Sequence, residues 1–177
     1  ISAKQTPSQL AQTCIRTVNT DPQATVTCYR KVLEKDPRNY VALTWLGWSL
    51  EIIARDLPAG GTTDELRAAA RSSVEKAIEI NPDYSYARAF RAVLAYRAGE
   101  FAKAKQYLAD FEAGDPSKDA EAVITHMDLA KLIDQGRPAD VVTVFESLEK
   151  NGEAEPAGGI AYLAEMASNT PSAANIR

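Results

Sequence analysis

The chain has 177 residues, a formal net charge of −4 and an isoelectric point near 5.1. With 45% hydrophobic and 25% charged residues, it has the composition of a folded chain that buries a core, which excludes a largely disordered protein. Nucleic-acid binding usually requires a clustered basic face, and the sequence has no Lys/Arg block. We therefore expect no nucleic-acid partner.

The sequence contains no apolar stretch near the ~20 residues that span a bilayer, and no signal-peptide pattern. Because the first residue is Ile1 rather than Met, we expect a processed or trimmed product, from which a signal or membrane anchor could have been removed. Contact with a membrane is expected only through such an anchor.

Three predicted helix ends share an acidic or amide residue followed by proline, at residues 36–37, 81–82 and 115–116. Proline cannot continue a helix, so each pair marks a stop. Pro82 and Pro116 are 34 residues apart, the period of the tetratricopeptide repeat (TPR), whereas Pro37 and Pro82 are 45 apart.

The clearest repeat predicts one helix over residues 84–97 and a second over 101–112. Ala92 and Ala104 would let the two helices approach closely, and Gly99 would form the turn between them. These offsets resemble the TPR pattern, although Arg91 stands where the family usually has Leu, so its stem must snorkel. The resemblance implies an all-α fold, a right-handed superhelix of antiparallel helix pairs.

The other repeats follow the same plan with more divergence, and together they predict a single domain over residues 1–177. In the unit that contains Leu46-Gly47, an inserted loop is expected, with Thr63 or Asp64 capping the helix after it. Asp21-Pro22 is expected to open the second helix of the first unit. The predicted units cover residues 6–37, 40–82 (inserted loop 56–64), 83–116 and, in divergent form, 117–152, followed by a capping helix over 160–168.

The two cysteines lie on the facing helices of the first unit. Cys14 is expected to point inward, and Cys28 to lie beside the usual core position. Either a disulfide or two small buried apolar residues fits this arrangement. Two thiols cannot form a zinc site alone, and His126 is the only histidine, so we expect no metal.

Motifs for catalysis are missing from the sequence. It has no phosphate-binding loop and no nucleophile elbow, and only His126 could serve as a base for a nucleophile. We therefore predict that the protein is not an enzyme and requires no cofactor.

In TPR proteins the first helix of each pair lines the inner wall of the superhelix. Carrying the family's positions over predicts a partner-binding groove lined by Thr44, Trp48, Glu51, Ile52, Tyr86, Ala89, Val93, Tyr96, Arg97 and His126.

Trp48 is the main candidate anchor in this groove, because an indole offers a large contact area and one N–H donor. If so, Trp48→Ala should weaken partner binding while leaving helicity and melting nearly unchanged. The alternative is that Trp48 packs on a neighbouring helix, and Trp45 is expected in the core. Tyr96 and Arg97 could hold a peptide backbone or a carboxylate, or could simply face solvent.

Segments 42–48, 77–84 and 89–93 resemble a narrower group, the membrane-anchored TPR proteins of actinobacteria that are similar to the TPR part of c-type cytochrome biogenesis proteins. That resemblance implies an extracytoplasmic location, favours the disulfide, and implies a chaperone-like groove for an unfolded or C-terminal peptide. A cytoplasmic location is the alternative.

Two functions follow. The first is an adaptor or chaperone that binds a peptide or protein in its groove, for example during cytochrome c maturation in the cell envelope. The second is a structural module that forms homo-oligomers by stacking an exposed helix pair on a second copy.

Overall fold

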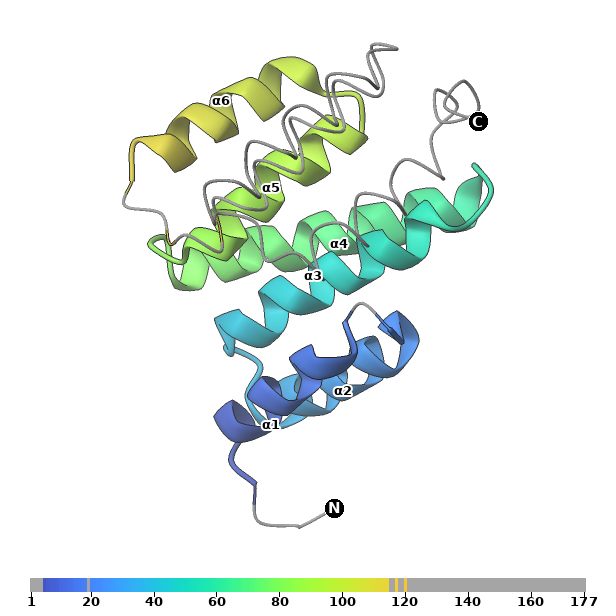
Figure 1. Ribbon diagram of the computed structural model, residues 1–177, viewed down its shortest axis with the longest axis vertical. Helices are drawn as coiled ribbons and strands as arrows, with labels where there is room; N and C mark the ends of the chain where they lie inside the picture. The colour runs from blue at the N-terminus through green and yellow to red at the C-terminus, as the bar shows by residue number, and fades with distance from the viewer. Residues whose placement is uncertain (1–4, 19, 115–116, 118–119, 121–177) are drawn as a thin grey trace, which may run out of the picture. The chain divides into compact units, whose positions relative to one another are not determined.

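The chain folds into successive antiparallel helix pairs, seen in a computed structural model that describes residues 5–18, 20–114, 117 and 120 (Figure 1). These residues fall almost entirely within the first of two units, Ile1–Asp115. Every regular element among them is helical, and the described part resembles stacked TPR pairs. The elements are α1 (Pro7–Cys14), a 3₁₀ turn η1 (Ile15–Thr17), α2 (Pro22–Lys35), α3 (Tyr40–Arg55), α4 (Gly61–Ile80), α5 (Ser85–Arg97) and α6 (Phe101–Glu112).

Side-chain caps explain where the first helices begin. Thr6 accepts a hydrogen bond from the Gln9 amide while the Gln9 side chain accepts one from the Thr6 amide, which forms a capping box. Asp21 caps α2 and is followed by proline at the first helical position, and Asn39 caps α3. The predicted opening of α2 at Asp21-Pro22 is confirmed.

The pair α3/α4 packs closely because Gly47 has no side chain. A Cβ placed there would lie 2.7 Å from both the Ala70 carbonyl oxygen and a methyl carbon of Val74. Between α5 and α6, Gly99 has a φ of +77°, a left-handed conformation that glycine adopts without strain. The turn predicted at Gly99 is confirmed.

The long connection in the second unit is shorter than predicted. Residues 61–64 belong to α4, whose N-cap is Gly60 without a side-chain hydrogen bond, so the predicted caps Thr63 and Asp64 are wrong. The Thr63 hydroxyl instead donates a 2.6 Å hydrogen bond to the Pro58 carbonyl. The additional residues mostly lengthen α4, which has 20 residues, instead of forming a loop over 56–64.

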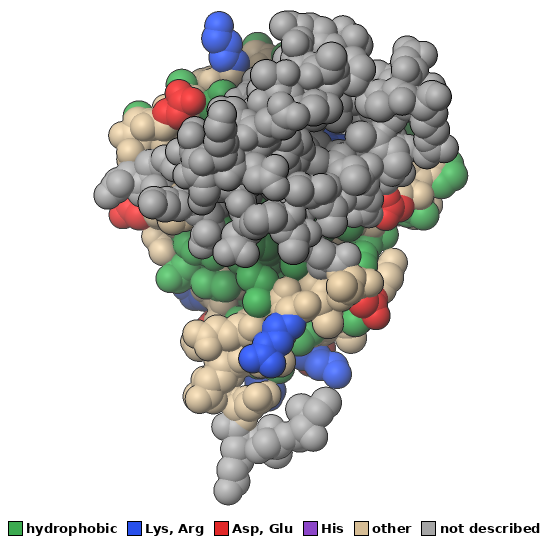
Figure 2. Space-filling model, in the orientation of Figure 1, with side chains coloured by type: hydrophobic (Ala, Val, Ile, Leu, Met, Phe, Trp, Pro, Cys, Tyr) green, Lys and Arg blue, Asp and Glu red, His purple; other side chains and the backbone are tan. Residues whose placement is uncertain are grey.

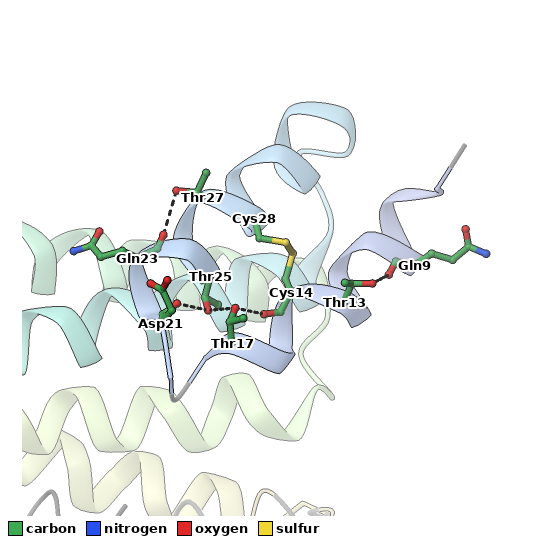
Figure 3. The surroundings of a disulfide bond; sticks show 9 residues. All are labelled: Gln9, Thr13, Cys14, Thr17, Asp21, Gln23, Thr25, Thr27 and Cys28. Carbon is green, nitrogen blue, oxygen red and sulfur yellow. Dashed lines mark hydrogen bonds between the residues drawn. A yellow bond between two sulfur atoms is a disulfide. The ribbon is translucent and has the colours of Figure 1, made fainter. Parts of the chain in front are cut away.

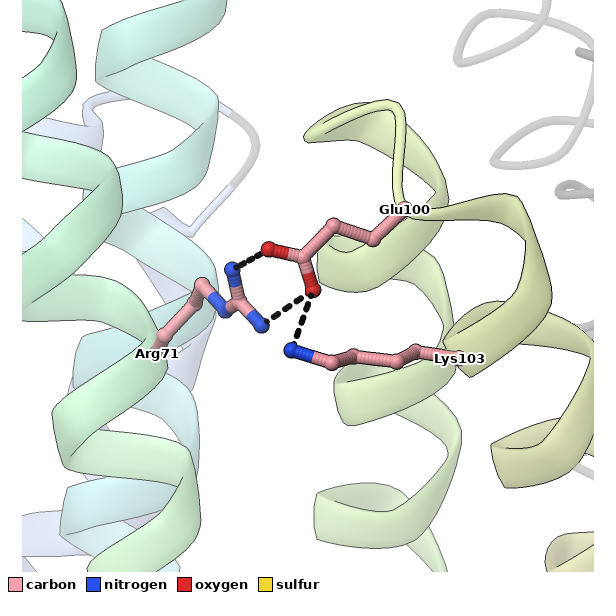
Figure 4. Close-up of polar contacts among 3 residues, drawn as sticks. All are labelled: Arg71, Glu100 and Lys103. Atoms are coloured by element: carbon pink, nitrogen blue, oxygen red, sulfur yellow. Dashed lines mark hydrogen bonds and ion pairs between the residues drawn. The ribbon is translucent and has the colours of Figure 1, made fainter.

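An ion-pair network joins α4 to the turn between α5 and α6 (Figure 4). The Arg71 guanidinium donates two hydrogen bonds, of 2.7 and 2.8 Å, to the Glu100 carboxylate, and the Lys103 ammonium lies 3.3 Å from the same carboxylate. The hydrogen bonds from Arg71, with a smaller contribution from Lys103, lower the pKa of Glu100 to about 2. This bidentate ion pair links the helix pair α3/α4 to the helix pair α5/α6.

Arg91 occupies a leucine position of the repeat without leaving its charge in the core. Its guanidinium lies over the Tyr107 ring, 4.2 Å from the centroid, and 3.8 Å from the Glu75 carboxylate. The side chain is 19% exposed, so the expected snorkelling is what the structure shows.

Candidate protein-binding site

The predicted groove residues within the described part come from α3 and α5, the first helices of two successive pairs (Figure 1). Tyr86 and Arg97 are half-buried, whereas the remaining seven are buried. The buried ones are Thr44, Trp48, Glu51, Ile52, Ala89, Val93 and Tyr96. His126 lies outside the described residues.

Trp48 stacks on another helix. Its ring lies nearly parallel to that of Phe90 on α5, with centroids 4.3 Å apart and an interplanar angle of 14°, and only 7% of the residue is exposed. Removing the indole therefore removes core packing, so the expectation that Trp48→Ala leaves melting unchanged does not fit this geometry. Whether Trp48 also anchors a partner stays a prediction.

Trp45 is only half-buried, although we expected it in the core. Its indole N–H donates a 3.2 Å hydrogen bond to the Tyr84 hydroxyl, and its ring contacts Tyr86 and Phe90 at 5.0 Å each. Tyr84 in turn packs edge-on against Tyr40 at 5.1 Å. Through these aromatic contacts, the N-terminal part of α3 packs against the N-terminal part of α5.

We call these four residues, Tyr40, Trp45, Tyr84 and Tyr86, the aromatic seam. Sequence reasoning predicted Tyr86 as a site residue and missed the other three. All four residues are half-buried, so part of each remains on the surface. In the space-filling view, hydrophobic side chains gather across the middle of the visible face (Figure 2). The signal in the sequence was the tyrosine that opens or precedes each first helix, at positions 40 and 84.

A buried carboxylate lies on α3 among arginines. Glu51 is 3% exposed, and one of its oxygens lies 3.5 Å from Nε of Arg67 on α4. Burial raises the pKa of Glu51, while Arg67, Arg97 and Arg55 oppose that rise. These arginines oppose the cost of burying the Glu51 carboxylate, and Arg67 joins it to α4.

Tyr96 lies near the C-terminal end of α5, and its ring is 5.4 Å from that of Phe101. Tyr96 is 9% exposed, whereas Phe101 is 63% exposed at the start of α6. Phe101 was not among the predicted site residues, since the repeat pattern assigns it to the second helix of its pair.

The two cysteines form a disulfide that joins the end of α1 to the middle of α2, with Cα atoms 5.6 Å apart (Figure 3). The Thr17 hydroxyl lies beside it, 3.3 Å from the Cys14 carbonyl and 2.8 Å from the Thr25 hydroxyl. Of the two arrangements that the residues left open, the structure has the disulfide.

Other site types find no support within the part of the chain that the structure describes. No group of three or more His, Cys, Asp or Glu residues there could hold a metal ion. In the same residues, no helix is long and apolar enough to cross a membrane.

Among solved structures, the chain is similar to TTC0263, a thermophilic TPR protein of Thermus thermophilus. The TM-score is 0.66, with 15% sequence identity, over 93% of this chain and 82% of that one. This likeness shows the fold: an all-α, TPR-like solenoid.

Residues 126–177 match a different family, the DnaB-like helicase N-terminal domain. Curated relatives include the replicative DNA helicase DnaB of Buchnera aphidicola subsp. Acyrthosiphon pisum, 51% identical over 45 residues, and that of Pasteurella multocida, 40% identical over 53 residues. These alignments cover 25% and 30% of this chain, which spans about a tenth of the length of either relative.

The helicase match overlaps the segments where a divergent repeat over 117–152 and a cap over 160–168 were predicted. Both segments lie outside the described residues, so the two elements stay predictions. None of these matches is a cytochrome c biogenesis protein, and that narrower resemblance also stays a prediction. The chain thus has the fold of TPR proteins, and its last 52 residues are similar to a DnaB-like helicase N-terminal domain.

Proposed function

We propose that this chain is a protein-binding module, without catalytic activity of its own, that connects a partner held by its TPR-like pairs to a replicative helicase. One observation carries the proposal: a TPR-like solenoid and a segment similar to a DnaB-like helicase N-terminal domain occur in the same chain. TPR-type solenoids present extended surfaces suited to polypeptide partners. The similarity of the last segment to a helicase domain supports a replicative helicase as one protein of the assembly.

The partner would lie along α3 and α5. The aromatic seam offers flat apolar surface with one internal hydrogen bond already made, from Trp45 to Tyr84. Further along these two helices, Arg97 of α5 acts on the buried Glu51 of α3, together with Arg67 of α4, so the charge of this carboxylate is matched within the chain. Apolar and ring contacts along this surface would hold an extended or helical segment of the partner.

A helicase partner favours the cytoplasmic location over the extracytoplasmic one. The disulfide points the other way, because stable disulfides are typical of oxidising compartments. The finer expectation of an envelope chaperone for cytochrome c maturation rests on the sequence resemblance alone, and we give it second place.

The test is a binding titration of the full chain against the purified replicative helicase of its source organism, read by light scattering and by fluorescence anisotropy. We expect a defined complex with the helicase. In a second titration, against the partner held along α3 and α5, Tyr86→Ala should bind about tenfold more weakly than the natural chain. Lys76→Gln is the matched control, because Lys76 is exposed on α4. It should change affinity less than twofold.

Two outcomes would contradict the proposal. If the helicase does not bind at micromolar concentration, the helicase connection is wrong. If the chain forms a stable dimer that excludes all other proteins, the self-association module is the better description.

A further inference from the structure

Apart from the disulfide, few buried side chains hold helix α1 against α2. It has 8 residues, and isolated helices shorter than ~12–15 residues are marginal in water. Only Ala11 and Cys14 of this helix are buried, while Leu10 packs partly against the same cluster. The contact of α1 with α2 therefore depends on the Cys14–Cys28 bond.

The two sulfur-bearing residues differ in their access to solvent. Cys14 is 1% exposed, whereas Cys28, in the middle of α2, is half-buried. Disulfides are reduced by attack of a thiolate on one sulfur, which expels the other. A reductant in solution would therefore reach the sulfur of Cys28 and expel that of Cys14.

The expelled sulfur is poorly placed to carry a negative charge. Cys14 is the last residue of α1 before η1, and it is buried in the cluster that contains Ala11, Tyr29 and Val32. Burial disfavours a thiolate, so Cys14 must take up a proton or reach water. Either outcome is easier once α1 moves away from α2.

We propose that Cys14–Cys28 is an exchange site for a dithiol reductant, and that its reduction releases α1. In the first step a thiolate of the dithiol attacks Sγ of Cys28, a mixed disulfide forms, and Sγ of Cys14 leaves and is protonated. In the mixed disulfide, the reductant's first sulfur is bonded to Sγ of Cys28. The second thiol of the reductant attacks that first sulfur and expels Sγ of Cys28. Two electrons pass to the protein, which gains two thiols, and the dithiol becomes a disulfide.

Release of α1 would uncover a specific apolar surface. Ala11 and Cys14 cover a cluster that includes Tyr29 and Val32 on α2 and Ala42 on α3, all three 0% exposed. The hydroxyl contact between Thr17 and Thr25, 2.8 Å, would keep η1 beside α2 while the helix before it swings away. Reduction would thus uncover this cluster at the N-terminal end of the helical stack, and this effect does not require the helicase partner.

The test uses the full chain with its natural cysteines. First, the chain is incubated with reduced glutathione, a monothiol, and adducts are mapped by mass spectrometry. We expect the adduct on Cys28 in at least about tenfold excess over Cys14, because Cys28 is the more accessible residue of the two. A majority of adduct on Cys14 would overturn the direction of exchange.

Second, the chain is reduced with dithiothreitol, and amide hydrogen exchange is measured separately for each helix. Exchange in residues 7–14 should rise at least about tenfold after reduction, while α3 keeps its protection. The Cys14→Ser, Cys28→Ser variant should match the reduced protein in both buffers. Unchanged exchange in α1 after complete reduction would refute the release, and so would a bond reduced only in denaturant or a loss of protection in every helix.

Discussion

Gly47 should be irreplaceable in spite of its position inside a helix. Gly47→Ala would gain about 1 kcal/mol of helix propensity in the middle of α3. The new Cβ would lie 2.7 Å from the Ala70 carbonyl oxygen and 2.7 Å from the Val74 methyl carbon, which is below any ordinary van der Waals contact. The Ala70 oxygen belongs to the backbone of α4, so relief requires the two helices to separate.

Overpacking costs about 1–3 kcal/mol, and the upper part of that range, about 2–3 kcal/mol, applies here because the Ala70 oxygen is backbone. After the gain in helix propensity is subtracted, the net destabilisation should be about 1–2 kcal/mol. In a chain of this size the melting temperature should fall by roughly 2–8 °C. The assay is urea unfolding followed by circular dichroism, with the midpoint and slope fitted separately.

Gly61→Ala is the matched control, because a Cβ at Gly61, the first residue of α4, meets nothing within 4 Å. It should be neutral or stabilising. Equal or greater stability of Gly47→Ala relative to the unchanged protein would refute the close approach of α3 and α4.

Three further predictions concern the stacked rings, the disulfide and an exposed carboxylate. Trp48→Ala should lower the free energy of unfolding by about 3–5 kcal/mol, because it empties the space beside Phe90. Trp48→Phe should recover part of this loss. Equal stability of the two variants in urea unfolding would refute the stacking of Trp48 on Phe90. Replacing Cys14 and Cys28 together by Ser should lower the free energy of unfolding by about 3 kcal/mol, as expected for a closed loop of about 15 residues. Reduction of the natural chain should lower it by a similar amount. A change near zero in either measurement would contradict a stabilising role of the disulfide. The folded pKa of Glu100, about 2, lies below its ordinary 4.5, so its ion pairs add stability above pH 4.5 that is lost as the pH falls toward 2. Unfolding of Glu100→Gln across that range should show a flatter pH dependence than the natural chain, and an identical slope would show that these ion pairs contribute nothing.

The helix pairs could be predicted from the sequence because their ends carry local signals. Asp21-Pro22 opens α2, Gly99 turns the chain between α5 and α6, and prolines follow α2 and α4. Each signal acts within a few residues, so it can be interpreted without knowledge of the packing. The start of α4 was mispredicted because Gly60 caps it without a side chain, and Thr63 bonds backward to Pro58 instead.

The site could be predicted only in part, because a repeat position indicates the helix face but not how deeply a side chain is buried. The inner-wall register placed Trp48 and Glu51 on α3, where the structure has them. It could not show that Phe90 stacks on Trp48, nor that Trp45 is the more exposed of the two indoles. Those outcomes depend on the approach of α3 and α5, which no local sequence signal reports.

The disulfide illustrates the same limit. Spacing placed Cys14 and Cys28 on facing helices, but their separation depends on the packing of α1 against α2. The helicase-like segment was missed for another reason. Its apolar spacing is helical, so it fitted a further repeat as well as it fits a different family.

The most direct test of a binding surface along α3 and α5 is site-specific photo-crosslinking within the assembled complex. A photoreactive phenylalanine would replace Tyr86 on α5 in one sample and Lys76 on the exposed side of α4 in a second. After irradiation with the helicase and its associated proteins present, we predict crosslinks to a partner polypeptide from position 86 and none above background from position 76. Equal crosslinking from both positions, or from position 76 alone, would contradict the assignment of the binding surface to α3 and α5.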